Sequence, residues 1–248
     1  MDNVIIITGA GRGIGAATAL AAARAGYRIC INYLADDASA HRVLEQVRAL
    51  GAEAITVRAD VSVEDEIIQL FQRVDKELGR VTARVNNAGT IGHQSRVEEM
   101  SEFRLLKLMK TNVVGPMLCA RHALQRMSTR HGGPGGAIVN VSSVAARLGS
   151  PNEYVDYAAS KGALDTFTLG LAKEVAGEGV RVNGVRPGYI FTDFHALSGD
   201  AERVRKLEPC IPMGRGGQAA EVAEAILWLL SDKASYTTGS FIDLGGGR

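Results

Sequence analysis

The chain has 248 residues, with 28 lysines and arginines against 27 acidic residues and a formal charge of +1. This length suits one α/β domain with its own core. The balanced charge, without basic stretches interleaved with aromatic residues, argues against nucleic acid as a partner. Three cysteines without short spacing and five scattered histidines favour neither a disulfide framework nor a metal site. Because no export signal or membrane-length apolar run is visible, we expect a soluble cytoplasmic protein that does not bind membranes.

The first predicted element is a strand buried on both faces, from Val4 to Thr8, because the run is continuously apolar and β-branched. Glycines follow at once, and an alanine-rich helix is predicted from about Gly13 to Arg24. Glycines allow the backbone to approach a phosphate, and the free N–H groups at the start of the helix point at the anion. This order of strand, glycines and helix predicts dinucleotide binding by the loop residues Gly9, Gly11, Arg12, Gly13, Ile14 and Gly15.

The second predicted strand ends with Asn32 and Tyr33, which should therefore lie near the adenosine ribose of the dinucleotide. An acidic residue in that place usually marks NAD. The next acid is Asp36, in the group of residues expected to cap the following helix. Arg12, inside the glycine loop, can pair with the 2′-phosphate of NADP. We therefore expect NADP, with NAD as the alternative if Asp36 folds back to the ribose.

Strands and helices alternate along the rest of the chain. Strands are predicted at Arg28–Tyr33, Glu53–Arg58, Val81–Val85, Ala137–Ser142, Val180–Arg186 and Phe241–Leu244, and helices at about Asp36–Leu50, Ser62–Gly79, Ser101–Arg130, Tyr157–Val175 and Gln218–Ser231. The pattern predicts one doubly wound, Rossmann-type α/β domain, with about seven parallel strands in the order 3-2-1-4-5-6-7. Ser62 is predicted to cap its helix. Arg84 breaks the pattern, because it lies in a strand that should be apolar on both faces.

A tyrosine and a lysine four residues apart, Tyr157 and Lys161, follow the pair Ser142-Ser143. If Tyr157 opens a helix, the two side chains share one face, roughly 6 Å apart along the axis. A phenol titrates near pH ~10, and a cation held nearby lowers that value. Such a phenol can give a proton to a carbonyl or take one from an alcohol. Ser143 can hydrogen-bond the same oxygen, with Ser142 as a weaker candidate.

The chain resembles the short-chain dehydrogenase/reductase family over essentially its whole length. The motifs that carry the resemblance occur in the family's order: Thr8-Gly9-x-x-x-Gly13-Ile14-Gly15, Asn86-Asn87-Ala88-Gly89, Asn112, Ser143, Tyr157-x-x-x-Lys161 and Pro187-Gly188. The resemblance implies that Tyr157 is the acid/base and that Ser143 orients the substrate oxygen. It also implies that Lys161 binds the nicotinamide ribose and lowers the pKa of Tyr157, and that Asn112 holds a relay water.

The resemblance extends to the cofactor and to assembly. It implies cofactor contacts from residues that follow the strands, namely Asp60, Val61, Asn87, Ala88, Gly89, Pro187, Gly188, Ile190 and Thr192, in addition to Tyr157 and Lys161. Members of the family commonly form tetramers through the helices that hold Asn112 and Tyr157. We therefore expect a homo-tetramer acting on a small carbonyl or alcohol substrate.

The substrate is not named by these residues. Its specificity should reside in the long connection from Tyr189 to Gly217 and around His93 and Ser150 to Val155. A sugar 1-dehydrogenase and a 3-oxoacyl thioester reductase, with NAD(H) in place of NADP(H), are the alternatives within the class. A nucleotide-binding regulatory protein without catalysis is the alternative outside it. A nucleotide-sugar epimerase ranks lower, because too little chain follows Pro187 for a separate substrate domain.

Overall fold

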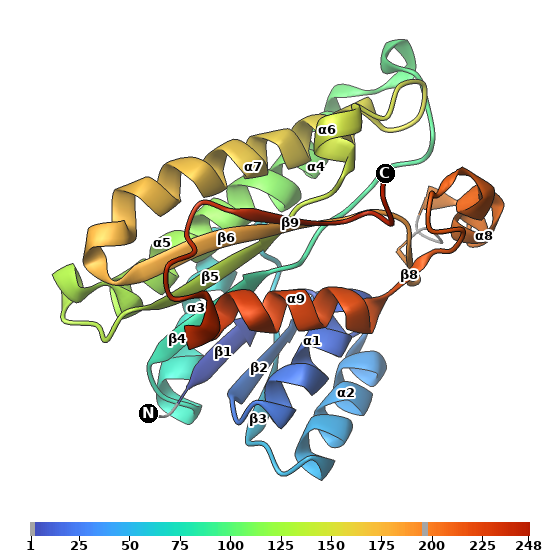
Figure 1. Cartoon of the computed structure of the whole chain (residues 1–248). Helices are drawn as coiled ribbons and strands as arrows, with labels where there is room; N and C mark the ends of the chain where they lie inside the picture. The colour runs from blue at the N-terminus through green and yellow to red at the C-terminus, as the bar shows by residue number, and fades with distance from the viewer. Residues whose placement is uncertain (1–2, 195–197) are drawn as a thin grey trace.

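The computed structural model describes residues 3–194 and 198–248, and these contain one parallel sheet of seven strands in the order β3-β2-β1-β4-β5-β6-β9. The order confirms the predicted doubly wound fold, with β9 as the seventh strand (Figure 1). The bounds are β1 (Val4–Ile7), β2 (Arg28–Tyr33), β3 (Ala54–Arg58), β4 (Val81–Asn86), β5 (Gly136–Val141), β6 (Val180–Pro187) and β9 (Phe241–Leu244).

Helices cover both faces of the sheet, which explains why its strands are apolar on both sides. One face packs against α1 (Gly13–Arg24), α2 (Asp37–Ala49) and α9 (Ala219–Leu230), and the other against α3 (Glu64–Glu77), α4 (Glu102–Met109), α5 (Gly115–Met127) and α7 (Val155–Val175) (Figure 1). Alternate residues of β1 serve the two layers: Ile5 and Ile7 face the first, and Val4 and Ile6 the second.

All seven strands run in the same direction, so their carboxyl ends meet at one edge of the sheet. The order reverses at β1, whose neighbours are β2 on one side and β4 on the other. Loops that follow β1 and β4 therefore leave in opposite directions and open a crevice between them. The short helix α6 (Ala145–Leu148) lies in the connection from β5 to α7 at the same edge.

The connection from Tyr189 to Gly217, predicted as a binding segment, contains short elements of its own. It holds β7 (Ile190–Phe191), α8 (Arg203–Leu207) and a 3₁₀ turn at Glu208–Cys210, and β7 pairs with β8 (Gly217–Gln218). The N–H of Gly217 donates to the carbonyl of Tyr189 over 2.8 Å, which ties the two ends of the segment together. Residues 195–197 lie outside the described part of the chain. In Figure 1 α8 stands apart from the two helical layers.

Two expectations about helices need correction. The region predicted as one helix from Ser101 to Arg130 is α4, a π-helical turn at Lys110–Val114 and then α5, which ends at Met127. The turn contains Asn112. The predicted cap Ser62 is wrong: α3 begins at Glu64, and Ser62 donates its N–H to the carboxylate of Asp60 instead, over 2.8 Å.

No helix in the described residues is long and apolar enough to cross a bilayer. They also contain no cluster of three or more histidine, cysteine, aspartate or glutamate side chains arranged to hold a metal ion.

Candidate active site

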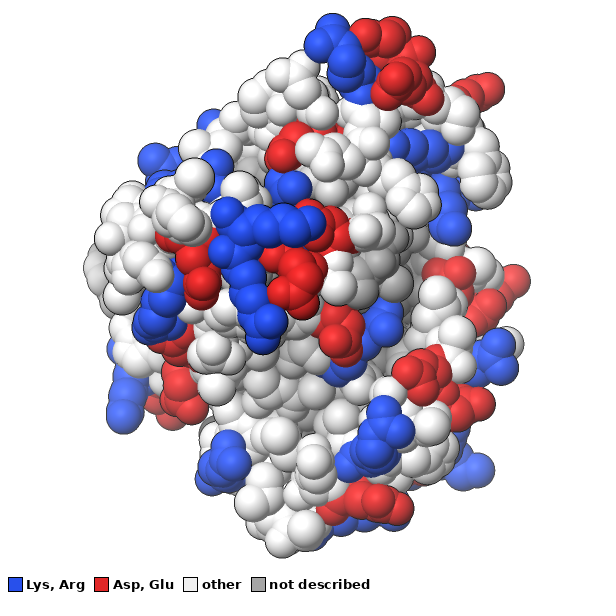
Figure 2. Space-filling view, turned by 90° about the vertical axis from the view of Figure 1, so that its right-hand side faces the viewer, with Lys and Arg blue, Asp and Glu red and all other residues white. Residues whose placement is uncertain are grey.

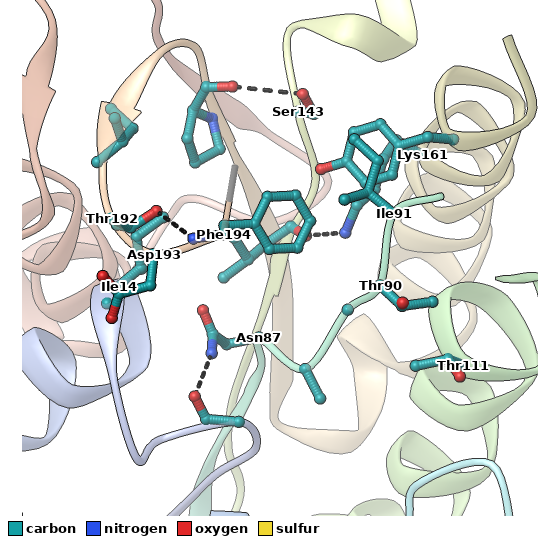
Figure 3. Close-up of a pocket in the computed structure, with 18 of the residues that line it drawn as sticks. Ile14, Asn87, Thr90, Ile91, Thr111, Ser143, Lys161, Thr192, Asp193 and Phe194 are labelled. Carbon is teal, nitrogen blue, oxygen red and sulfur yellow. Dashed lines mark hydrogen bonds between the residues drawn. The ribbon is translucent and has the colours of Figure 1, made fainter. Parts of the chain in front are cut away.

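A cleft of about 1050 Å³ runs along the carboxyl edge of the sheet. Its wall contains every residue predicted to contact the cofactor except Gly15, together with the predicted catalytic residues Ser143, Tyr157 and Lys161. In Figure 3 Ser143 and Lys161 lie on one side of this pocket, and Ile14 and Thr192 on the other. Basic and acidic side chains are interspersed on the face that holds α8 and the C-terminus, so no single sign of charge dominates it (Figure 2).

The glycine loop has the geometry of a phosphate cradle. Gly9 and Gly13 have φ values of +62° and +55°, a backbone conformation that residues other than glycine rarely adopt. Among the described residues, Arg12 at the start of α1 makes no side-chain capping bond, so the first N–H groups of this helix remain available to an anion. Gly15 serves packing, because a Cβ there would lie 2.5 Å from the carbonyl oxygen of Gly9.

Hydrogen bonds join the glycine loop to the loop after β4. The hydroxyl of Thr8 accepts from the N–H groups of Asn87 and Ala88, each over 3.1 Å. The Asn87 amide donates to the carbonyls of Thr8 and Gly9 over 2.8 and 3.1 Å (Figure 3). The crevice between β1 and β4 is therefore held at a fixed width where a dinucleotide would lie across it.

At the adenosine end, the structure separates Asn32 from Asp36. The Asn32 amide is buried and donates to the carbonyls of Val57 and Ala59, so it braces β2 against β3 rather than reaching a ribose. Asp36 caps α2, as expected, by accepting from the N–H and hydroxyl of Ser39 over 2.9 and 2.7 Å. These two bonds hold the pKa of Asp36 below its usual value. Both side chains are therefore engaged in hydrogen bonds within the protein.

The helix α7 presents Tyr157 and Lys161 to the cleft on one face, as their spacing predicts. The Lys161 ammonium lies 5.6 Å from the centre of the Tyr157 ring and donates to the carbonyl of Val141 over 2.8 Å. The Ser143 side chain lies close enough to the phenol to lower the pKa of Tyr157, and its hydroxyl donates to the carbonyl of Pro187 over 3.5 Å (Figure 3). Ser142 instead donates to the backbone carbonyl of Lys161 over 3.3 Å. The structure therefore favours Ser143 over Ser142 as the serine beside the phenol.

Burial dominates the electrostatics of this pair. It raises the pKa of Tyr157 to about 12, an effect that the hydrogen bond from Ser143 only partly opposes. It also lowers the pKa of Lys161 to about 8, against the opposing effect of Asp165. In the cofactor-free protein, desolvation by burial is therefore the largest influence on the pKa of Tyr157. The expectation that Lys161 lowers this pKa stays a prediction.

Asn112 lies one layer behind the cleft wall and is fully buried. Its amide donates to the carbonyl of Thr90 over 2.9 Å and to the hydroxyl of Ser160 over 3.1 Å, and its oxygen accepts from the N–H of Thr90 over 2.8 Å. A Cβ on Gly89 would lie 3.5 Å from the Asn112 oxygen and 3.7 Å from the Lys161 nitrogen. Asn112 thus joins the loop after β4 to α7, and its predicted relay water stays a prediction.

Comparisons with known proteins agree with this arrangement. Residues 9–248 match the model of a family described as enoyl-(acyl carrier protein) reductase. A solved short-chain type dehydrogenase/reductase from Mycobacterium marinum superimposes with a TM-score of 0.92 at 33% identity, covering 99% of this chain and 94% of that one. The chain belongs to the short-chain dehydrogenase/reductase family. It is therefore an oxidoreductase of the type that uses a nicotinamide cofactor.

Two relatives match the chain over nearly its whole length. An uncharacterized oxidoreductase, YgfF, of Escherichia coli is 52% identical over 245 residues, which is 99% of each protein. The 3-oxoacyl-[acyl-carrier-protein] reductase FabG of Staphylococcus aureus is 34% identical over 247 residues, covering 100% of this chain and 98% of that protein. A nicotinamide dinucleotide fits the cleft, because the glycine loop leaves room for phosphates and the catalytic side chains stand at the other end.

The substrate end of the cleft is built by residues that the sequence did not single out. The Phe194 ring lies 6.0 Å from that of Tyr157, and Arg203 pairs with Glu153 over 2.5 Å. The Arg203 guanidinium also lies over the rings of Tyr154 and Tyr189. Glu153 and Tyr154 lie in the predicted region 150–155. Tyr189, Phe194 and Arg203 lie in the predicted connection 189–217, for which the length of the connection was the signal.

Proposed function

We propose that this enzyme transfers hydride reversibly between NADP(H) and a carbonyl or secondary alcohol substrate. The observation that carries the proposal is the meeting of Ser143, Tyr157 and Lys161 at one end of a cleft whose other wall is the glycine loop. A protein that only binds a nucleotide needs the loop but not these three side chains. The rival interpretation as a non-catalytic regulatory protein is therefore the weaker one.

Tyr157, Ser143 and Lys161 each have a separate role in the proposed reaction. The cofactor, when bound, supplies or accepts the hydride. In reduction the Tyr157 hydroxyl gives its proton to the carbonyl oxygen as the carbonyl carbon gains hydride, so that C=O becomes CH–OH. Ser143 hydrogen-bonds the same oxygen, and the Lys161 ammonium offsets the negative charge left on the phenol. Because burial raises the pKa of Tyr157 to about 12, the phenol stays protonated at neutral pH, which is the form that gives a proton in reduction.

The preference for NADP(H) rests on charge at the adenosine end. Arg12 is exposed on the cleft wall, where its guanidinium can bind a 2′-phosphate. The acid that would select NAD is engaged elsewhere, since Asp36 accepts both bonds from Ser39. We expect the Arg12→Ala variant to lose most of its preference for NADPH over NADH in kcat/KM. Asn32 does not contribute to this preference.

The similarity to FabG favours a 3-oxoacyl thioester as substrate, and a sugar 1-dehydrogenase is the second candidate. The test follows nicotinamide absorbance with NADPH and NADH in parallel. The panel contains ketones, diketones and 3-oxoacyl thioesters as substrates for reduction. Aldoses are tested for oxidation, with the oxidised forms of the two cofactors. Turnover with a thioester that exceeds turnover with simple ketones supports the first candidate, and oxidation of aldoses supports the second.

The variant Tyr157→Phe separates catalysis from binding. We expect turnover to fall by at least about 10³-fold while the dissociation constant for NADPH, measured by fluorescence, changes little. Tyr236→Phe is the matched control, because Tyr236 is fully exposed. Turnover of Tyr157→Phe near that of the wild type would contradict the assignment. Cofactor binding without turnover in the wild type would favour the regulatory protein. A cytoplasmic location is part of the same proposal.

A further inference from the structure

A partly buried ion pair lies one helical turn after Lys161 on α7 and has no part in the proposed reaction. Asp165 follows Lys161 by four residues on α7, so the two side chains share one face of the helix. The Asp165 carboxylate accepts from the Nε of Arg186, on β6, over 2.8 Å. Their side chains are only 13% and 17% exposed. Water therefore screens the charge of this carboxylate weakly.

Arg186 neutralises Asp165 incompletely. The Arg186 guanidinium is shared with a second carboxylate, Asp243 on β9, over 3.2 Å, and lies 3.8 Å from the centre of the Phe241 ring. The other oxygen of Asp165, Oδ1, is buried, and no described residue hydrogen-bonds it. A carboxylate with one oxygen unpartnered in a place of low dielectric keeps a strong negative potential toward its neighbours. The nearest functional cation along its helix is Lys161.

The surroundings of Lys161 contain little else that favours its charge. From β5 the Val141 carbonyl accepts from the ammonium, and a Cβ on Gly89, in the loop after β4, would lie 3.7 Å from the Lys161 nitrogen. Asn112 in the π-helical turn, 3.5 Å from the same Cβ position, is neutral. Tyr157 is the other titratable neighbour, and its phenol is protonated at neutral pH. Among the described residues, Asp165 is the charged group that acts on Lys161.

We propose that Asp165 is a positioning residue that keeps Lys161 in its charged form, with Arg186 holding the carboxylate one helical turn behind the ammonium. The role of that charge in catalysis rests on the proposed function. The electrostatic coupling does not, because it belongs to the protein alone. Burial drives Lys161 toward its neutral form, with a pKa of about 8, and Asp165 opposes this. Without Asp165, a large share of the enzyme would have a neutral Lys161 at neutral pH.

The test is an NMR titration of the cofactor-free protein with ¹³C-labelled lysine. Absence of a signal in the Lys161→Met variant identifies the Cε resonance of Lys161. In Asp165→Asn we expect the midpoint of the Lys161 titration to fall by about one pH unit, because an opposite charge nearby favours the charged form. The alkaline limb of the kcat profile should move by the same amount and in the same direction. An unchanged midpoint in Asp165→Asn would overturn the proposal whether or not a substrate is found.

Two further variants separate this effect from a structural one. Asp243→Asn removes the second carboxylate of Arg186 without touching α7, and it should leave the Lys161 midpoint within about 0.3 pH units of the wild type. Asp165→Glu keeps the charge and should restore most of the wild-type midpoint. If Asp165→Asn does not fold, Asp165→Ser removes the same charge and takes its place, with the same expected fall of the Lys161 midpoint; an unchanged midpoint in Asp165→Ser contradicts the proposal.

Discussion

The guanidinium of Arg84 is enclosed in the layer between the sheet and α3, where the sequence indicated that a charge does not belong. Its side chain is 0% exposed, its Nε donates to Asn86 over 2.9 Å, and it lies 5.7 Å from the centre of the Phe71 ring. No described residue hydrogen-bonds its two terminal nitrogens. Desolvation consequently lowers the pKa of Arg84. A charge buried with so few partners opposes folding.

Replacing this residue should therefore stabilise the protein. We expect Arg84→Met to raise the free energy of unfolding by about 1–2 kcal/mol, because an unbranched apolar side chain fills much of the same space without the desolvation cost. Urea denaturation at pH 7 measures the change. Arg73→Met is the control, since Arg73 is an exposed partner of Glu77, and its effect should stay within about 0.5 kcal/mol. A loss of stability in Arg84→Met would mean that its contacts with Asn86 and Phe71 outweigh desolvation.

Burial of the Lys161 ammonium also destabilises the fold, and the size of this effect depends on pH. The folded-state pKa of about 8 lies below the ordinary value of 10.5, so burial of the ammonium destabilises the fold below pH 8 and the penalty fades as pH rises toward 10.5. The stability advantage of Lys161→Met over the wild type should consequently shrink by about 2 kcal/mol between pH 7 and pH 10. Denaturation at both pH values measures it. Lys173→Met, at an exposed position of α7, should show no such trend.

At the scale of elements, the join between the π-helical turn and α5 depends on one glycine. A Cβ on Gly115 would lie 2.6 Å from the carbonyl oxygen of Val61, next to the expected adenine site. We expect Gly115→Ala to lower the free energy of unfolding by about 1–3 kcal/mol and to raise KM for the cofactor, because the backbone at Val61 must move. Gly170→Ala is the matched control: no atom of the described structure lies within 4 Å of its Cβ. Equal effects in both variants would contradict this account.

The strands and the glycine loop could be predicted from the sequence because local pattern and tertiary environment agree there. The run Val4–Ile7 is apolar throughout, so its own residues suffice to predict a buried strand. The turn after it needs a positive φ at Gly9, which a glycine allows. Asn32 and the pKa of Tyr157 could not be predicted. The direction of the Asn32 amide depends on two carbonyls of a neighbouring strand, and the burial of Tyr157 depends on residues far along the chain, such as Phe194.

At the scale of the whole molecule, α4 and α5 expose an apolar stripe. The exposed apolar residues along it are Phe103 and Leu106 on α4, Val114 in the π-helical turn and Met117 on α5, and Phe103 is 75% exposed. A stripe of this kind fits the expected association into a tetramer. We expect Phe103→Glu to give a lower molar mass in size-exclusion chromatography with light scattering. Val63→Glu, at the exposed position directly before α3, should leave the mass of the wild type unchanged. A wild type that is monomeric would contradict the expectation.

Different parts of the cleft wall come from different parts of the fold. The groups proposed to handle the proton and the dinucleotide are anchored in the sheet and in α7, while Thr192, Phe194 and Arg203 on the cleft wall come from the excursion between β7 and β8, whose ends are joined by the bond between Gly217 and Tyr189. Mutations in that excursion leave the core strands untouched. Descendants of one ancestral enzyme can therefore acquire new substrates by varying this excursion while the hydride chemistry stays as it was.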